Sequence, residues 1–203
     1  MAKVFLKSSD PDLLKTAKKI PESKISSKET TKIIQKMIKI ASGEQGNADK
    51  PIMVGLAAPQ IGISKRIILV DLKADGKGTV GDLRVFINPQ ITYFSKKENA
   101  WYEGCYSLPG ICGIVKRPTT IKVKAFTDHG QIWEDKVSGY VARIFQHEID
   151  HLDGKLFSSL ITNPNHLHKV KAEEFRLYRN RQAWRNWPKK QPLPLASLRL
   201  ENV

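Results

Sequence analysis

The chain has 203 residues, 40% of them hydrophobic and 27% charged, and its 34 basic against 20 acidic residues give a net charge of +14. Such a composition is typical of a globular protein. Because no apolar run approaches the roughly 18 residues of a membrane helix, and the N-terminus lacks the apolar stretch of a secretory signal, we expect a cytoplasmic protein without a membrane partner.

The length accommodates one domain with a sizeable core. We expect a single catalytic domain over residues 1–187 and an extended or flexible tail over 188–203, where three prolines fall within seven residues. The two cysteines, Cys105 and Cys112, are too few for a disulfide scaffold, so their thiols remain available for metal binding or catalysis in a reducing compartment. The positive charge keeps RNA among the possible partners, and we expect no DNA partner.

The first predicted element is a helix that begins at a capping box formed by Ser26 and Glu29. After a glycine-containing loop, the segments 66–72 and 83–94 are rich in β-branched and aromatic residues and predict strands. The segment 120–137 alternates in character on both sides of 128–130, which indicates a hairpin. The sheet is therefore expected to be largely antiparallel.

A second helix is predicted over 140–152, capped by Ser138 and ended by Gly154. Asn163 and Pro164 are expected to open a last helix, with one apolar stripe along it made of Leu167, Val170, Leu177 and Tyr178. The sequence thus predicts an α+β fold: largely antiparallel sheets around a central helix, with an N-terminal and a C-terminal helix.

The central helix contains the pattern H-E-x-x-H, formed by His147, Glu148 and His151. Histidines at positions i and i+4 lie one above the other on a helix, so both imidazoles can bind one metal ion. The glutamate between them lies close to that ion without being a ligand. Catalytic sites of this kind usually have a third protein ligand and one open position for water.

Three sources of the third ligand follow from known patterns. A metzincin peptidase is excluded, because Phe157 occupies the position of its third histidine. A thermolysin-like metallopeptidase would use a glutamate from a following helix, such as Glu173 or Glu174. Cys105 is the other candidate, since a thiolate with two imidazoles is an established catalytic set.

Three segments, GLAAPQ, EGCYS and QHEIDH, occur in this order, and together they resemble the three motifs of the peptide deformylases. The chain departs from the family pattern at Met53, where glycine is usual, and at Tyr106, where leucine is usual. The resemblance implies metal-dependent removal of the formyl group from the N-terminal methionine of newly made polypeptides, with release of formate. It also implies that Cys105, His147 and His151 hold the metal, with iron(II) the usual ion and zinc, nickel or cobalt able to replace it.

In such a site the metal lowers the pKa of a water molecule and polarises the formyl oxygen. Glu148 would act as general base and then general acid. Gln60 would stabilise the developing oxyanion with its side-chain amide, and the resemblance implies a second donor in the backbone N–H of Tyr106. Gly55 would let the bound peptide approach closely. Arg143 and Ile144, one turn before His147, are predicted to line the methionine pocket, and Glu103 is predicted to orient a nearby basic group or the backbone.

The substrate is first available at the ribosome, and the C-terminal region is basic. The segment 165–190 has eight lysines and arginines against two glutamates, a local balance of 8 − 2 = +6. The basic residues are Lys169, Lys171, Arg176, Arg179, Arg181, Arg185, Lys189 and Lys190. We therefore predict that a basic C-terminal helix can contact ribosomal RNA phosphates.

Overall fold

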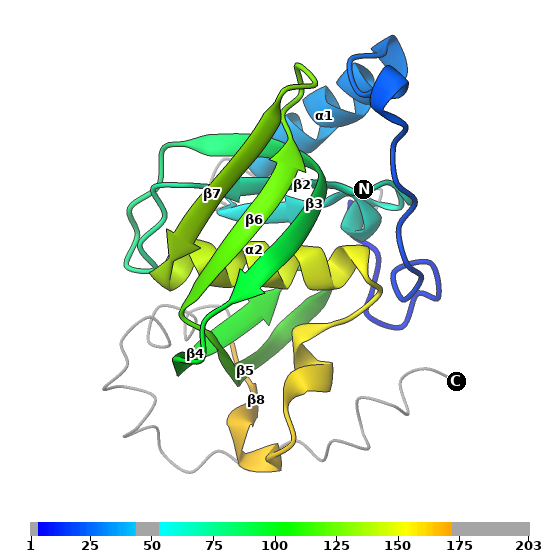
Figure 1. The fold of residues 1–203 in the computed structure, drawn as a ribbon. Coiled ribbons are helices and arrows are strands. Elements are labelled where there is room, and N and C mark those ends of the chain that lie inside the picture. Colours follow the sequence, from blue (N-terminus) through cyan, green and yellow to red (C-terminus); the bar gives the residue numbers. More distant parts are fainter. Residues whose placement is uncertain (1–3, 44–52, 172–203) are drawn as a thin grey trace.

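A computed structural model describes residues 4–43 and 53–171 of the chain and has the expected α+β architecture. Two antiparallel sheets enclose a central helix (Figure 1). The larger sheet contains β1 (Gly55–Ala57), β2 (Ile67–Asp71), β3 (Leu83–Phe94), β6 (Thr120–Phe126) and β7 (Ile132–Ser138), in the order β1-β2-β3-β6-β7. The smaller contains β4 (Glu98–Cys105), β5 (Leu108–Pro118) and β8 (Leu167–Lys169), in the order β4-β5-β8.

The five-stranded sheet has two apolar faces because successive side chains of a strand point to opposite sides. In β2, Ile68 and Val70 belong to the cluster that contains the apolar residues of the central helix. Ile67 and Leu69 belong to the other cluster, which contains the buried residues of the N-terminal helix. All five β2 residues are buried, so β2 is covered on both faces.

The N-terminal helix α1 (Lys28–Ala41) packs against one face of this sheet through Ile34, Met37 and Ile40. The predicted cap at Ser26 is wrong by one residue. Ser27 caps the helix, with its hydroxyl accepting a hydrogen bond from the Thr30 N–H at 3.3 Å. The preceding short 3-10 helix, Glu22–Lys24, explains the shift: the Ser27 N–H donates to the carbonyl of Lys24, which holds Ser27 in the capping position.

The central helix α2 (Gly139–Leu152) lies between the other face of this sheet and the β4–β5 hairpin (Figure 1). Ser138 stands at its N-cap position, but its side chain makes no capping hydrogen bond. Gly154 follows the helix with a φ of +71° and lies against the backbone of Leu14, so its position leaves no room for a side chain. Among the described residues, no helix has both the length and the apolar character that crossing a membrane requires.

The β4–β5 hairpin, which the sequence analysis did not predict, has Tyr106 and Ser107 as its two-residue turn. Cys105 is the last residue of β4 and pairs with Leu108, the first of β5. The hairpin predicted around 128–130 is confirmed between β6 and β7. The strands predicted over 66–72 and 83–94 are confirmed as β2 and β3.

The predicted last helix is wrong in the part that the structure describes. Pro164–His166 forms a single 3-10 turn, and the chain then continues as β8. Leu167 pairs with Gly113 of β5 and is fully buried in a small apolar cluster, so strand pairing and burial outweigh the helical spacing. Of the other expected helix residues, Val170 is buried but not helical, and Leu177 and Tyr178 lie outside the described residues, as does the tail over 188–203.

Candidate metal centre

Three predicted ligand side chains meet between α2 and the end of β4. The Cys105 Sγ and one ring nitrogen each of His147 and His151 lie within 4.8 Å of one another. Sγ of Cys105 is 3.3 Å from Nε2 of His151, and the two imidazole ring centroids are 5.0 Å apart. Helix α2 carries the two histidines one turn apart. Cys105 lies at the end of β4, in the three-stranded sheet, just before the hairpin turn.

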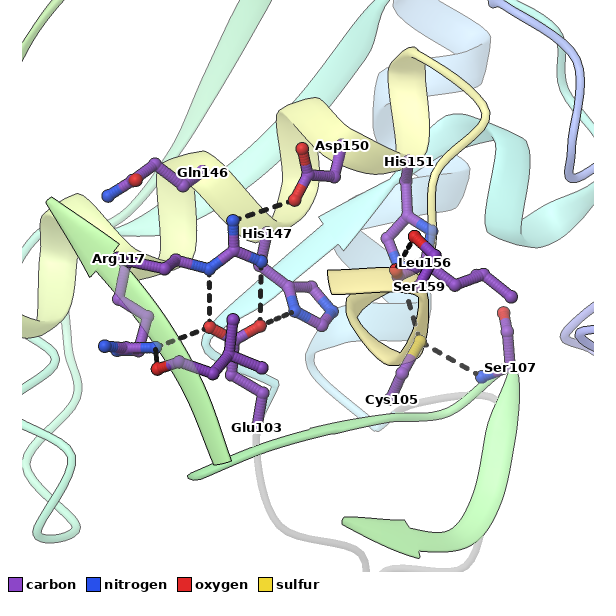
Figure 2. Close-up of polar contacts among 12 residues, drawn as sticks. Glu103, Cys105, Ser107, Arg117, Gln146, His147, Asp150, His151, Leu156 and Ser159 are labelled. Atoms are coloured by element: carbon purple, nitrogen blue, oxygen red, sulfur yellow. Dashed lines mark hydrogen bonds and ion pairs between the residues drawn. The ribbon is translucent and has the colours of Figure 1, made fainter. Parts of the chain in front are cut away.

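Glu103 orients the first imidazole. Its Oε2 lies 2.9 Å from Nδ1 of His147, so the other ring nitrogen, Nε2, is the one left for a metal (Figure 2). Burial alone would raise the pKa of Glu103, but hydrogen bonds from Arg117 and His147 hold this pKa well below its usual value. Glu103 is therefore a buried carboxylate. The predicted contact between Glu103 and a basic group is confirmed.

The thiol of Cys105 lies in surroundings that favour its deprotonated form. It receives hydrogen bonds from the side-chain amide of Gln60 at 3.3 Å and from the Ser107 N–H at 3.4 Å. Although burial raises the pKa of a thiol, the neighbouring His151 and His147 lower the pKa of Cys105 well below its ordinary value. A thiolate is the form of cysteine that binds metals.

Glu148 lies in the same buried site. Burial raises its pKa to about 7. Within the described part of the chain, its Oε2 has no hydrogen-bond partner. A Cβ atom placed on Gly55 would lie 2.5 Å from Oε1 of Glu148 and 2.8 Å from Cγ2 of Ile144. Gly55 thus lets the β1 backbone lie directly against this carboxylate.

Gln60 and Tyr106, the predicted oxyanion donors, both lie beside Cys105. Gln60 is held in place by the Ala57 N–H, which donates to its Oε1 at 2.7 Å and turns its NH₂ group toward the thiol. Tyr106 forms half of the hairpin turn, and its ring stacks on Phe5 with centroids 5.0 Å apart. The role of its backbone N–H stays a prediction.

The guanidinium of Arg143, a residue predicted to line the methionine pocket, is directed at β4 and β5. Its guanidinium binds Glu103, Val115 and Asn99. Arg117, which the sequence analysis did not single out, binds Glu103 with two nitrogens at 2.6 and 2.8 Å. It also donates to Asp150 of α2 at 2.8 Å, as Figure 2 shows.

The donor set fits a metal ion. Bonds of about 2.0–2.3 Å, as nitrogen and sulfur ligands form, allow one ion to reach all three atoms after a small inward adjustment of the side chains. The unpartnered carboxylate oxygen of Glu148 faces no protein donor among the described residues, which leaves it available to a polar ligand of the site. Sulfur with two imidazole nitrogens suits iron, zinc, nickel or cobalt rather than magnesium or calcium.

Comparison with known proteins gives concordant results. The family model described as polypeptide deformylase matches residues 2–166. A peptide deformylase of Prochlorococcus marinus (strain AS9601) is 37% identical over 73% of this chain and 73% of its own length. One of Pelotomaculum thermopropionicum is 48% identical over 64% of this chain and 79% of its own. A Met-Ala-Ser-bound class I type b peptide deformylase from Acinetobacter baumannii superimposes with a TM-score of 0.69 at 32% identity, covering 79% of this chain and all of that one.

Proposed function

The chain belongs to the polypeptide deformylase family, and on that premise we propose that it hydrolyses the formyl group from the N-terminal methionine of newly made polypeptides and releases formate. The observation that carries this proposal is the meeting of a thiol, two imidazoles and an unpartnered carboxylate in one buried site. The thermolysin-like alternative is not favoured, because the family match is to deformylases.

Cys105, His147 and His151 would hold one divalent ion, with iron(II) the ion we propose for the cell and zinc, nickel or cobalt as substitutes. When bound, such an ion supplies water of lowered pKa and a Lewis acid for the formyl oxygen. Glu103 would keep Nε2 of His147 turned toward the ion, because its hydrogen bond to Nδ1 fixes the ring orientation.

Glu148 would transfer the protons. Hydrolysis adds the oxygen of water to the formyl carbon and breaks the bond between that carbon and the amide nitrogen. Glu148 accepts a proton from the attacking water and delivers it to the departing nitrogen, which leaves as a neutral amine. Burial, which raises the pKa of Glu148, favours the first step because it strengthens the affinity of the carboxylate for a proton.

Gln60 and Tyr106 would stabilise the negative charge that develops on the formyl oxygen. The side-chain amide nitrogen of Gln60 carries two hydrogens, and its bond to Cys105 uses one of them. The backbone N–H of Tyr106 would be the second donor. Fixed donors of this kind are each typically worth about 3 kcal/mol in the transition state.

Gly55 and Ile144 would contact the bound methionyl peptide. Among the strands that the structure describes, β1 lies at the edge of the five-stranded sheet, so one side of its backbone could pair with an extended peptide. The Acinetobacter relative was solved with Met-Ala-Ser bound, a peptide that begins with methionine. This likeness supports a peptide substrate whose first residue is methionine.

One assay tests the proposal. Purified protein loaded with iron(II) under anaerobic conditions is given formyl-Met-Ala-Ser and, separately, a longer peptide with a free N-terminus. We expect formate release from the first and no internal cleavage of the second. Cys105→Ala should lose metal and activity, whereas Glu173→Ala and Glu174→Ala should keep both. Internal cleavage, or a metal that stays in Cys105→Ala and leaves in a glutamate variant, contradicts the proposal.

We further propose a cytoplasmic enzyme whose basic C-terminal region contacts the ribosome. Lys169 and Lys171 are exposed, and the remaining basic residues of this region lie outside the described residues. Replacement of Lys169, Arg176 and Arg179 by glutamate should reduce co-sedimentation with ribosomes, and added salt should weaken the binding of the parent steeply. Equal co-sedimentation of both proteins at low salt, with equal activity on a short peptide, contradicts the contact.

A further inference from the structure

Arg143 lies one helical turn before His147 and is almost fully buried, with 4% of its surface exposed. One terminal nitrogen donates to Oε1 of Glu103 at 2.7 Å and to the Val115 carbonyl at 3.0 Å. The other donates to the side-chain and backbone oxygens of Asn99 at 2.8 and 2.9 Å. Each terminal nitrogen of a guanidinium carries two hydrogens, so all four are used inside the protein.

We infer that Arg143 is a positioning residue for the metal ligand His147, acting through Glu103, and that its charged group takes no part in the methionine pocket. None of these four terminal hydrogens is left for a substrate. Its two side-chain partners, Glu103 and Asn99, both belong to β4, whereas Arg143 belongs to α2. The side chain therefore joins the strand that ends at Cys105 to the helix that carries both histidines.

The orientation of the Glu103 carboxylate depends on its contact with Arg143, because all of its acceptor sites are occupied. Oε1 accepts from Arg143 and from Nε of Arg117, at 2.7 and 2.6 Å. Oε2 accepts from the other Arg117 nitrogen at 2.8 Å and lies 2.9 Å from Nδ1 of His147. A carboxylate offers about four lone-pair sites, so these four contacts define one orientation. Without Arg143, Oε1 loses one of its two donors.

The expected consequence is weaker metal binding. Loss of a group that directly orients a metal-bound histidine typically lowers metal affinity by about 10- to 100-fold. Arg143 acts one contact further out, so we expect about a tenfold loss, at the lower end of that range. The loss should occur without substrate and without any change in the three ligands.

Arg66 provides a matched control. It is also a buried arginine, 8% exposed, and it also binds the C-terminal end of α2, through the carbonyl of Leu152 and the side chain of the following residue, Asp153. Among the described contacts it has none with Glu103. A loss of packing and of buried hydrogen bonds therefore affects both arginines, whereas reorientation of His147 should follow only from Arg143.

The experiment compares Arg143→Met and Arg143→Lys with Arg66→Met and Arg66→Lys. Cobalt(II) affinity is measured by competition with a chelator, the geometry of the site by the visible cobalt spectrum, and stability by urea unfolding of the metal-free protein. We expect comparable losses of stability in the two methionine variants, with weaker cobalt binding and an altered spectrum only in Arg143→Met. Arg143→Lys should show a smaller loss of affinity, because an ammonium can reach Glu103 but cannot also bridge to Asn99.

Parent-like affinity and spectrum in both Arg143 variants would overturn the inference, as would an equal loss in the Arg66 variants. If Arg143→Met does not fold, Arg143→Lys is compared with Arg66→Lys instead, again by cobalt affinity and spectrum. A second readout uses substrates: the ratio of kcat/KM for formyl-Met-Ala to formyl-norleucyl-Ala should stay unchanged in Arg143→Lys, and a changed ratio would assign Arg143 to the pocket instead. The inference rests on the proposed function only for this second readout, since cobalt binding is measured without turnover.

Discussion

The helices α1 and α2 are equally long, at 14 residues each, but their surroundings differ. α1 buries five residues, four of them apolar, and its other side is exposed. α2 buries nine, among them the polar Arg143, Gln146, Glu148 and His151. The comparison teaches that a helix covered on two sides can bury polar side chains for two different ends. Arg143 and Gln146 are satisfied by partners on β4 and β5, whereas Glu148 keeps an oxygen without a partner among the described residues, which leaves that oxygen available for chemistry.

The largest effect on catalysis is expected from a substitution in α2, whereas a matched substitution in α1 should leave catalysis unchanged. Glu148→Ala in α2 should lower kcat by about 10² to 10⁴-fold, because a general acid–base group contributes on that order. The metal content should stay unchanged, since Glu148 is not a ligand. Steady-state kinetics with metal analysis measures both, and Glu29→Ala on the exposed side of α1 is the control. A metal-loaded Glu148→Ala enzyme with near-normal kcat would contradict the role.

The reverse test disturbs the core contact of α1. Met37 is fully buried, so Met37→Ala should lower the free energy of unfolding by about 2–5 kcal/mol. The kcat of the folded fraction should be unchanged, because Met37 belongs to the cluster on the face of the sheet opposite α2. Urea unfolding and kinetics at low temperature measure these quantities. A fall in kcat comparable with that of Glu148→Ala would show that the two faces are not separate in function.

A third change tests the contact between β1 and α2. Gly55→Ala would place a methyl carbon 2.5 Å from Oε1 of Glu148 and 2.8 Å from Cγ2 of Ile144, so the carboxylate must move. A misplacement of about 1 Å can cost on the order of 10²-fold in rate, and we expect a fall in kcat/KM of that size. Metal content should not change. Normal kinetics would mean that Glu148 has room to adjust.

The smallest effect is expected on the exposed side of α1. Lys28, Lys32, Lys36 and Lys39 lie there at helical spacing and are all exposed. Their joint replacement by glutamine should change the free energy of unfolding by no more than about 0.5 kcal/mol per site. Thermal unfolding and kcat for a short formylated peptide should match the parent. A large loss of either would show that this side of α1 has a partner within the molecule.

Elements in which residue types recur at a regular helical or strand spacing could be predicted from the sequence. The spacing in α2, the β-branched segments of β2 and β3 and the turn between β6 and β7 all appear in the structure as expected. β5 was not, because Pro109, Gly110 and Gly113 are typical of loops. A Cβ atom at Gly113 would clash with Ile161, so this glycine is needed where the chain after α2 crosses the strand. Local sequence does not contain that tertiary reason.

The site was predictable where its residues are neighbours in sequence or lie in a known motif. His147, Glu148 and His151 follow from one helical spacing, and Cys105 and Gln60 from the family resemblance. Arg117 and Asp150 were missed, and Arg143 was assigned only to the pocket. Their partnership depends on the register of β4 with β5, in which Glu103 lies opposite Gly113, and on how α2 crosses both strands. Such long-range pairing leaves no local pattern.

The late position of β8 in the chain has a consequence for how this protein folds as it is synthesised. All three proposed ligands precede residue 152, but β5 obtains its second neighbour only when β8 pairs with it. Until Leu167 has emerged from the ribosome, β5 is an open edge and the apolar cluster around Phe157 is incomplete. A nascent chain that already contains all three proposed ligands therefore still lacks one strand of the smaller sheet. We expect the site to become ordered only after β8 has left the ribosome.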